Sequence, residues 1–166
     1  MTKIIKLFNL LIYAFILSIP VFSQGYRIEV KIEGLRDTSI YLAYHFGEKK
    51  LVHDTLYLDK HGEGVFEDDK KLDAGIYLIA LPNMNFFELI VDKDQEFLVS
   101  TDTTDLLKFI KFTGSVQNSI FIEYQRFMAE QQKKSGSLSN RWKLSKDNPD
   151  SLDAITEEMK MLDSLL

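Results

Sequence analysis

The chain has 166 residues, of which 45% are hydrophobic and 27% charged, and it contains three prolines, eight glycines and no cysteine. These values exclude a collagenous or low-complexity chain and predict one globular domain of ordinary size with additional segments. The lack of cysteine excludes disulfide bonds and any thiol chemistry by this chain itself, because both need a cysteine sulfur.

The first 23 residues differ from the rest of the chain. Two lysines precede an apolar run over residues 7–19, a proline follows it, and Val21 and Ser23 then occupy the −3 and −1 positions of a cleavage site. This order is typical of a secretory signal peptide that is cleaved before Gln24. We therefore expect an exported protein of the periplasm or cell envelope.

The alternative for this segment is an uncleaved membrane anchor. The apolar run is shorter than the about 20 residues that span a bilayer, which favours the signal peptide. No cysteine follows the run, so a lipid-anchored lipoprotein is excluded. We expect contact with the membrane only through the signal peptide, before cleavage.

The charge of the remaining chain narrows the choice of partners. Residues 1–23 hold two lysines and no acids, so the rest carries 18 basic and 25 acidic residues, a net charge of −7. Binding to nucleic acid depends on neutralising phosphates, and anionic lipid surfaces attract basic segments. Neither partner is expected here.

Residues 24–114 predict a mostly β domain, an antiparallel sandwich or barrel. The expected strands are residues 26–33, 38–44, 51–58, 64–67, 75–81, 86–91, 96–100 and 106–112. In the first strand Ile28, Val30 and Ile32 alternate with polar residues, the period of a half-buried strand. Residues 75–81 are nearly all apolar, so we expect burial on both faces. Because no helical segment separates the strands, we expect antiparallel pairing.

A helix is expected over residues 115–130. Ser115 is a suitable N-cap. A stripe of apolar residues follows at helical spacing, and we expect it to pack against the sheet. The stripe consists of Val116, Ile120, Phe121, Tyr124, Phe127 and Met128.

The last part of the chain predicts a linker and the beginning of a helical segment. Residues 131–149 are polar and serine-rich, typical of a flexible linker, and Trp142 is expected to anchor the next element by packing. Residues 150–166 form a helical pattern whose apolar stripe is unfinished at the end. We expect the sequence to end inside a domain; the alternative is a terminus that docks or dimerises. The stripe consists of Leu152, Ile155, Met159 and Leu162.

No residue is assigned a catalytic, cofactor-binding or metal-binding role. His45, His53 and His61 fall at a strand end, inside a strand and in a turn, so we do not expect them to converge on a metal. Residues 92–96 resemble the start of a calcium loop, but Phe97 stands where an EF-hand needs glycine. A hairpin turn is expected there instead.

Aromatic residues are frequent in the expected strands. Some of them could line a ligand groove, but aromatic residues at strand spacing more often form the core or cross-strand pairs. The residues concerned are Tyr41, Tyr44, Tyr57, Tyr77, Phe86 and Phe87. The sequence contains no Gly-x-Ser-x-Gly motif and no glycine-rich phosphate loop, so a hydrolase or a nucleotide-binding enzyme has no support.

The order of several short segments resembles a known family. The segments are Ile-Glu-Gly at 32–34, Ile-Tyr-Leu at 40–42, Asp-Thr at 54–55, residues 58–66 (LDKHGEGVF), residues 74–78 (AGIYL), and residues 112–115 (FTGS) with Asn118. Over about residues 25–130 this order is similar to the β-rich N-terminal domain of unknown function that precedes a thioredoxin-like domain in exported thiol–disulfide oxidoreductases of Bacteroidetes. Residues 142–166 resemble the helical segment that comes after it.

This resemblance implies a non-catalytic accessory domain that recognises a substrate, dimerises or tethers the enzyme. Its partner would be a downstream or separate thioredoxin-like domain, a protein client or a second copy. Such a domain raises the effective concentration of the redox centre near its clients. The Cys-x-x-Cys motif of the family is absent, so no catalytic residue is carried over. The alternative is a stand-alone envelope protein that binds a peptide, lipid or glycan, by β-augmentation at a sheet edge.

Overall fold

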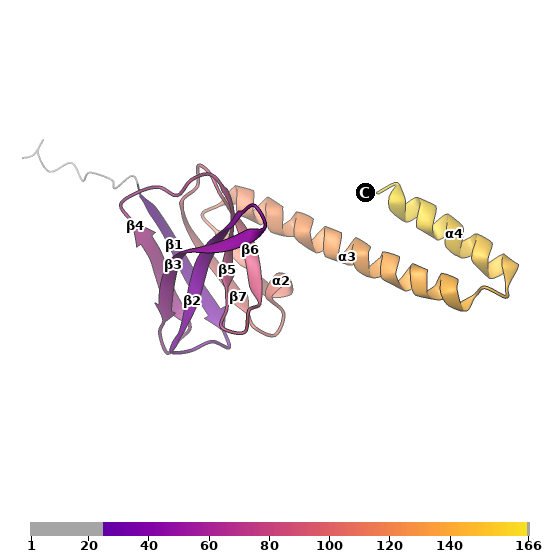
Figure 1. The fold of residues 1–166 in the computed structure, drawn as a ribbon, viewed down its shortest axis with the longest axis horizontal. Coiled ribbons are helices and arrows are strands. Elements are labelled where there is room, and N and C mark those ends of the chain that lie inside the picture. The colour runs from indigo at the N-terminus through magenta and orange to yellow at the C-terminus, as the bar shows by residue number, and fades with distance from the viewer. Residues whose placement is uncertain (1–24, 166) are drawn as a thin grey trace, which may run out of the picture.

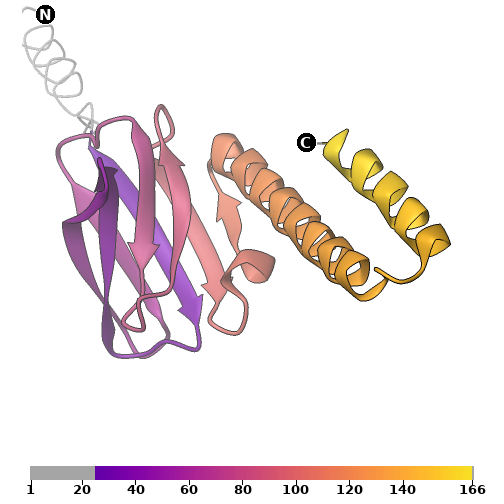
Figure 2. The ribbon, with the colours of Figure 1, turned by 45° about the vertical axis from the view of Figure 1, so that its right-hand side comes forward.

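The computed structural model describes residues 25–165, which form a β-sandwich followed by a two-helix arm (Figure 1). The predicted mostly β domain with a C-terminal helical segment is confirmed. The two sheets have four strands each. The long helix of the arm leaves the sandwich, and the last helix folds back beside it (Figure 2). The predicted signal peptide, residues 1–23, lies outside the described residues.

Each of the two sheets contains four strands. The first sheet has the order β4 (Glu63–Asp68), β1 (Tyr26–Glu33), β7 (Glu96–Asp102) and β8 (Lys111–Thr113). The second sheet has the order β3 (Lys49–Leu58), β2 (Thr38–Phe46), β5 (Gly75–Ala80) and β6 (Phe86–Val91). The helices are α2 (Leu106–Phe109), α3 (Val116–Leu144) and α4 (Pro149–Asp163).

One pair of strands is parallel, so the expectation of purely antiparallel pairing was wrong. β1 and β7 run in the same direction, with Arg27 opposite Glu96 and Glu33 opposite Asp102. A parallel pair needs a long crossover, which is usually a helix. Here the crossover passes through the second sheet, so no helical segment marks it in the sequence.

The strand expected over residues 106–112 was also wrong. The chain forms the short helix α2, passes through the buried Ile110, and only then forms β8. Asp105 caps α2 by accepting a hydrogen bond from the Lys108 amide at 3.0 Å, and the Thr101 hydroxyl donates to the Leu106 carbonyl at 2.8 Å. These two bonds favour a helical turn over an extended strand.

The core lies between the two sheets. Ile28, Val30 and Ile32 are buried in it, as their alternation predicts. In β5 the adjacent Leu78 and Ile79 are both buried, but Ile76 is exposed. The expectation of burial on both faces therefore holds only for the middle of this strand.

The β2–β3 hairpin explains why the outer face of β5 is covered. The pairing of the two strands shifts register after Leu42, and the hairpin bends across the second sheet. Lys50 of β3 places its Nζ atom 3.6 Å from the centre of the Phe86 ring, although β3 and β6 are opposite edges of the sheet. His45 of β2 also reaches β6, with Nε2 at 3.7 Å from Glu88 Oε1.

The linker expected over residues 131–149 was wrong for most of its length. α3 is one helix of 29 residues that continues to Leu144, and α4 begins at Pro149 behind the N-cap Asn148. The polar residues remain helical because α4 packs against Leu138 through Ile155 and Leu162. Trp142, expected as an anchor, is exposed and is not part of this cluster.

Within residues 25–165, no helix has both the length and the apolar character that a membrane span requires.

Candidate functional site

A buried asparagine attaches α3 to the second sheet. Asn118 Oδ1 accepts a hydrogen bond from the Ile90 amide at 2.7 Å, and Asn118 Nδ2 donates to the Ile90 carbonyl at 2.8 Å. The side chain thus pairs with β6 as a neighbouring strand would. It closes this edge of the sheet and sets the face of α3 that lies against it.

The N-cap of α3 holds the asparagine in position. The Ser115 hydroxyl accepts hydrogen bonds from the Asn118 amide at 3.3 Å and from Asn118 Nδ2 at 3.1 Å. It also donates to Asp94 Oδ2 at 3.4 Å, in the turn that follows β6. The cap therefore connects the start of α3 to the sandwich as well as satisfying its first amides.

An arginine fixes the rotation of α3 at a second point. Arg126 Nε donates to the Leu107 carbonyl at 2.9 Å, and Nη2 donates to the carbonyls of Lys108 at 3.1 Å and Ile110 at 2.5 Å. A cation at the C-terminal end of α2 also suits the dipole of that helix. With Asn118 and Arg126 facing the sandwich, the helix cannot turn its apolar stripe toward the sheet.

The expected packing of the apolar stripe against the sheet was therefore wrong for most of its residues, since only Phe121 is half-buried, and Tyr124 and Met128 reach β6 only as walls of a groove. Val116, Ile120 and Tyr124 are 72%, 62% and 57% exposed, whereas Ile122 on the sheet side is buried. Phe127 is also exposed. We call Val116, Ile120, Tyr124 and Phe127 the outer stripe.

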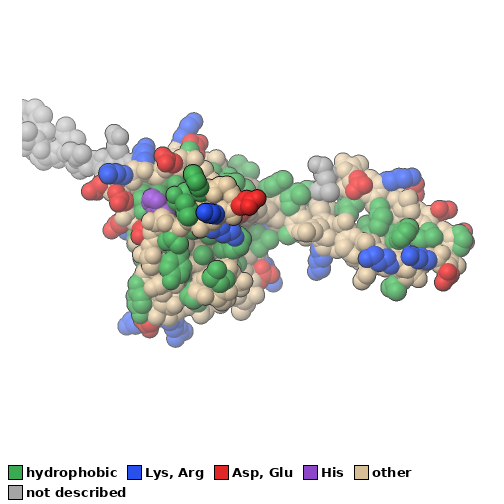
Figure 3. Space-filling model, viewed as in Figure 1, with side chains coloured by type: hydrophobic (Ala, Val, Ile, Leu, Met, Phe, Trp, Pro, Cys, Tyr) green, Lys and Arg blue, Asp and Glu red, His purple; other side chains and the backbone are tan. Residues whose placement is uncertain are grey.

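A groove lies between β6, α2 and α3. Its volume is about 720 Å³, and most of its wall is apolar, with Phe86, Leu107, Tyr124 and Met128 contributing. This size lies within the range of pockets that hold small molecules or single side chains. Hydrophobic side chains are gathered on this side of the sandwich and where α3 leaves it (Figure 3).

One polar pair belongs to the groove wall. Gln125 Nε2 of α3 donates to Glu88 Oε2 of β6 at 3.1 Å, and the other oxygen of Glu88 faces His45. Glu88 is therefore held between a neutral donor and an imidazole. The groove combines an apolar wall with an acceptor of fixed orientation, which is the composition of a binding site.

Comparison with known proteins identifies the domain that supplies the β6 and α2 walls of this groove. A family model described as a domain of unknown function, DUF4369, matches residues 26–121. The chain belongs to this family. The DUF4369 match covers every strand of the sandwich and the first turns of α3, so the predicted resemblance to a domain of unknown function is confirmed at that level. No curated protein and no solved structure matches the chain.

The three histidines lie at separate places in the DUF4369 domain. His45 is near Glu88, His53 lies in β3, and His61 is in the turn between β3 and β4. Across residues 25–165, no three potential metal-ligating side chains of His, Cys, Asp or Glu come together.

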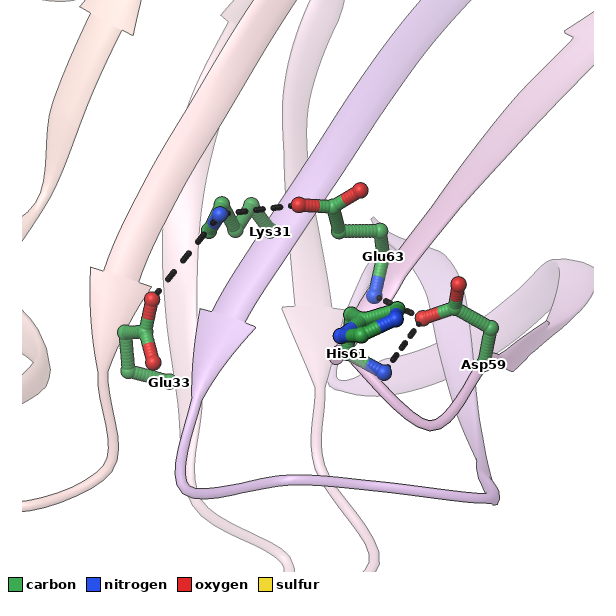
Figure 4. Close-up of polar contacts among 5 residues, drawn as sticks. All are labelled: Lys31, Glu33, Asp59, His61 and Glu63. Carbon is green, nitrogen blue, oxygen red and sulfur yellow. Dashed lines mark hydrogen bonds and ion pairs between the residues drawn. The ribbon is translucent and has the colours of Figure 1, made fainter.

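The turn that contains His61 has a structural role, because polar contacts hold it against β1 (Figure 4). Asp59 Oδ1 accepts hydrogen bonds from the amides of His61 at 2.8 Å and Glu63 at 2.9 Å. The bond from Glu63, followed by that from His61, lowers the pKa of Asp59. Lys31 of β1 places Nζ 2.8 Å from Glu63 Oε1 and 4.0 Å from Glu33 Oε1. These contacts hold the β3–β4 turn against β1.

His53 lies in an aromatic cluster at one end of the DUF4369 sandwich. Its ring centre is 6.1, 6.5 and 6.3 Å from those of Tyr26, Tyr44 and Tyr77. Burial, together with the nearby Asp54, raises the pKa of Tyr26 to about 12. The Tyr26 hydroxyl donates to Asp54 Oδ2 at 3.3 Å. Tyr26 and Tyr77 are buried in the core and Tyr44 packs against it, whereas His53 is exposed at its edge.

The other aromatic residues of the DUF4369 domain divide between core and surface. Phe87 is buried in the core, and Phe86 lines the groove. Tyr41 and Tyr57 are exposed on the second sheet. Phe87 therefore fits the interpretation of these aromatic residues as core, and Phe86 fits their interpretation as part of a groove.

The turn at residues 92–96 connects the two sheets, so it is not the hairpin turn that was expected. The buried Gln95 fixes it: Nε2 donates to the carbonyls of Leu72 and Asp92, each at 3.0 Å, and Oε1 accepts from the Leu72 amide at 2.9 Å. The segment that resembles the start of a calcium loop is thus a crossover between β6 and β7 that the side chain of Gln95 holds in place.

Sequence reasoning did not find the groove. Its residues come from β6, α2 and α3, which are far apart in the chain. One signal was present: Asn118, Ile122, Gln125 and Arg126 recur at helical spacing and form a second, mixed face of the helix. A polar face of this kind can pack against a sheet edge when it satisfies backbone groups there.

Proposed function

We propose that this chain is a non-catalytic accessory module of an exported thioredoxin-like thiol–disulfide oxidoreductase, and that it recognises a polypeptide in the groove between β6 and α3. The observation that carries the proposal is the groove itself, an apolar hollow on a sandwich to which α3 is attached by Asn118 and Arg126. The segment order that resembles the N-terminal domains of such enzymes supports the redox context.

The chemistry divides between this chain and its partner. The chain has no cysteine, so the thiolate that attacks a disulfide must belong to another domain or protein. The groove takes an apolar side chain, and Glu88 accepts a hydrogen bond from a neighbouring amide of the same client. Holding the client there raises its effective concentration at the redox centre.

The compartment is part of the proposal. Residues 1–23 direct export, and the folded domain acts in the periplasm or envelope, where disulfides form and are exchanged. Fractionation of cells that express the chain tests this, since export predicts a mature product that begins at Gln24. A full-length product in the cytoplasm would contradict it.

The functional test uses the reading frame after Leu166 and the adjacent genes. We expect one of them to encode a thioredoxin-like domain with Cys-x-x-Cys. Joined to that domain, the chain should increase the rate at which a disulfide-bonded client protein is reduced. Phe86→Ala, which removes one groove wall, should abolish the increase, and Tyr57→Ala, on the exposed face of β3, should not. Absence of such a domain, or an equal rate with and without the chain, would count against the proposal.

The second candidate is a stand-alone envelope protein that binds a peptide, lipid or glycan. The open edge of β3 favours it, because among the described strands β3 pairs only with β2, and Val52 and Tyr57 are exposed there. A peptide can add to such an edge as a further strand. A ligand-dependent rise in melting temperature that Tyr57→Ala removes and Phe86→Ala retains would favour this candidate over the first.

A further inference from the structure

One face of α3 has different surroundings in the N-terminal and C-terminal halves of the helix. The outer stripe ends at Phe127, and Gln131 and Leu138 continue the same face at intervals of four and seven residues. α4 covers Leu138 with Ile155 and Leu162. The same face is thus covered by a helix in its C-terminal half and open in its N-terminal half.

The open half begins where α4 ends. α4 runs antiparallel to α3, and its C-terminal end lies beside the middle of α3 (Figure 1). Gln131, Leu162 and Leu165 line one small hollow at this point. From Phe127 to Val116 the outer stripe extends about 17 Å along the axis, the length of a helix of about 11 residues. A second helix in line with α4 would fit this space.

Gln131 marks the junction between the covered and the open half. Its side chain is 4% exposed, and its Oε1 atom has no hydrogen-bond partner among the described residues. It lines both the groove beside β6 and the hollow at the end of α4. A buried acceptor without a donor is unfavourable. The first turn of a helix beginning here has free amide groups that can donate to it.

The border of the outer stripe is acidic. Glu123 and Glu130 lie seven residues apart on one side of it. Glu130 pairs with Lys134 at 2.8 Å, whereas Glu123 has no ion pair within residues 25–165. Arg126, the nearest cation in sequence, is committed to the carbonyls of α2 and its neighbours. An occupant with a basic residue opposite Glu123 would complement this border.

The same border argues against a second copy of the chain. In an antiparallel pair of identical helices, residues on one border face their own equivalents. With the open halves paired, Glu123 of one copy would lie close to Glu123 of the other, which is repulsive.

We propose that the outer stripe binds an amphipathic helix of a partner protein, antiparallel to α3 and in line with α4. The apolar residues of this helix cover Ile120 and Tyr124, and a basic residue of the helix faces Glu123. The proposal does not depend on a redox partner, and the outer stripe shares only Tyr124 with the wall of the groove.

The test uses two synthetic helical peptides with one apolar stripe in common. One carries lysines and the other glutamates at the border positions, and each is titrated against the whole chain by fluorescence anisotropy. We expect the lysine peptide to bind and the glutamate peptide to bind at least about tenfold more weakly. Equal affinity for both peptides, or no binding of the lysine peptide, would overturn the proposal.

Variants of the chain locate the binding. Ile120→Lys should remove binding of the lysine peptide, and Leu144→Lys, a matched change at an exposed leucine outside the stripe, should leave it unchanged. Glu123→Lys should reverse the preference between the two peptides. Circular dichroism checks that each variant is folded. Binding that survives Ile120→Lys would place the site elsewhere and contradict the proposal.

Sedimentation velocity tests the alternative occupant of the outer stripe, a second copy of the chain. A dimer of the whole chain that dissociates in Ile120→Lys would assign the stripe to a second copy and overturn the proposal. A monomer that binds the lysine peptide supports it. Phe86→Ala separates this proposal from the groove, because it should keep peptide binding even where it abolishes the effect on a redox partner.

Discussion

The sandwich and the two-helix arm are stabilised in different ways. The sandwich has one continuous core to which both sheets and the N-terminal half of α3 contribute, including residues such as Phe66 and Ile122. The arm has a small cluster in which only Leu138, Ile155 and Leu162 are buried. Burial of apolar surface is the main favourable term in folding, so the sandwich is expected to fold cooperatively and the arm to depend on it.

The attachment of the arm is mainly polar, although Ile122 of α3 is also buried in the sandwich core. Asn118 and Arg126 satisfy backbone groups of β6 and α2, and the apolar side chains on the opposite face remain exposed. α3 therefore shows that a helix can dock on a sheet through hydrogen bonds while the hydrophobic side chains on its opposite face stay exposed to solvent. Changes in each region therefore have different expected consequences.

The largest expected difference in stability is between a core substitution in the sandwich and one in the arm. Phe66→Ala removes a side chain that is 1% exposed in the sandwich and should lower the free energy of unfolding by about 3–5 kcal/mol. Leu138→Ala should cost about 2 kcal/mol at most, since its cluster is small, and should act on the arm alone. Urea unfolding measures the first effect, and faster amide exchange confined to α4 and the end of α3 measures the second. Equal exchange throughout the chain in Leu138→Ala would mean that the arm and the sandwich unfold together.

The next effect concerns a turn of the sandwich. Gly62 has φ +75, and a Cβ atom there would lie 2.4 Å from the Ile32 carbonyl oxygen. Gly62→Ala combines backbone strain with this clash and should destabilise by about 2–4 kcal/mol.

Gly47 provides the matched control. It has φ +60, but nothing lies within 4 Å of the Cβ position. Gly47→Ala should therefore cost only the backbone strain, about 1 kcal/mol. Thermal unfolding of both variants separates strain from clash. A similar loss in the two would show that the close contact at Gly62 relaxes.

A third change tests the connection between the regions. Asn118→Ala leaves the amide and the carbonyl of Ile90 without partners and should cost about 2–3 kcal/mol. The Ile90 amide should also exchange faster with solvent. Gln117→Ala, at an exposed neighbouring position, should change neither quantity. Unchanged exchange of Ile90 in Asn118→Ala would show that α3 is held mainly by Arg126 and packing.

A smaller effect depends on pH and belongs to the sandwich alone. The pKa of Tyr26 is raised to about 12 in the folded chain, from about 10 when unfolded. Its stabilising contribution is therefore complete below pH 10 and is lost as the pH rises through 12. Tyr26→Phe should cost about 1 kcal/mol at neutral pH and remove this part of the alkaline loss. Absorbance at high pH should show one tyrosine fewer titrating late.

The smallest effect is expected at the surface of the arm. Arg141 and Glu158 form a two-point ion pair at 2.7 and 3.1 Å, and the hydrogen bond from Arg141 lowers the pKa of Glu158. The stabilisation is present above the unfolded pKa and is lost as the pH falls through the folded value. Because the pair is exposed, Glu158→Gln should hardly change the melting temperature, and added salt should reduce the difference. A clear drop would show that this pair is essential to α4.

The sequence predicted much of the fold and little of the candidate site. The alternation of Ile28, Val30 and Ile32 identified a strand and its buried face because the period of two is local. The N-cap Ser115 marked the start of α3 for the same reason. The groove was not predictable, since Phe86 and Met128 meet only after the sheet and α3 have packed.

The sequence by itself determined the composition of the strands, the starts of the two long helices and the lack of thiol chemistry, because each depends on neighbouring residues or on a residue type. Only the tertiary structure decided the parallel pairing of β1 with β7, the continuation of α3 to Leu144, and which face of α3 meets the sheet. In the last case hydrophobicity favoured one face, but Asn118 could pair with both backbone groups of Ile90 only from the other. Satisfying buried backbone groups thus took precedence over burying an apolar stripe.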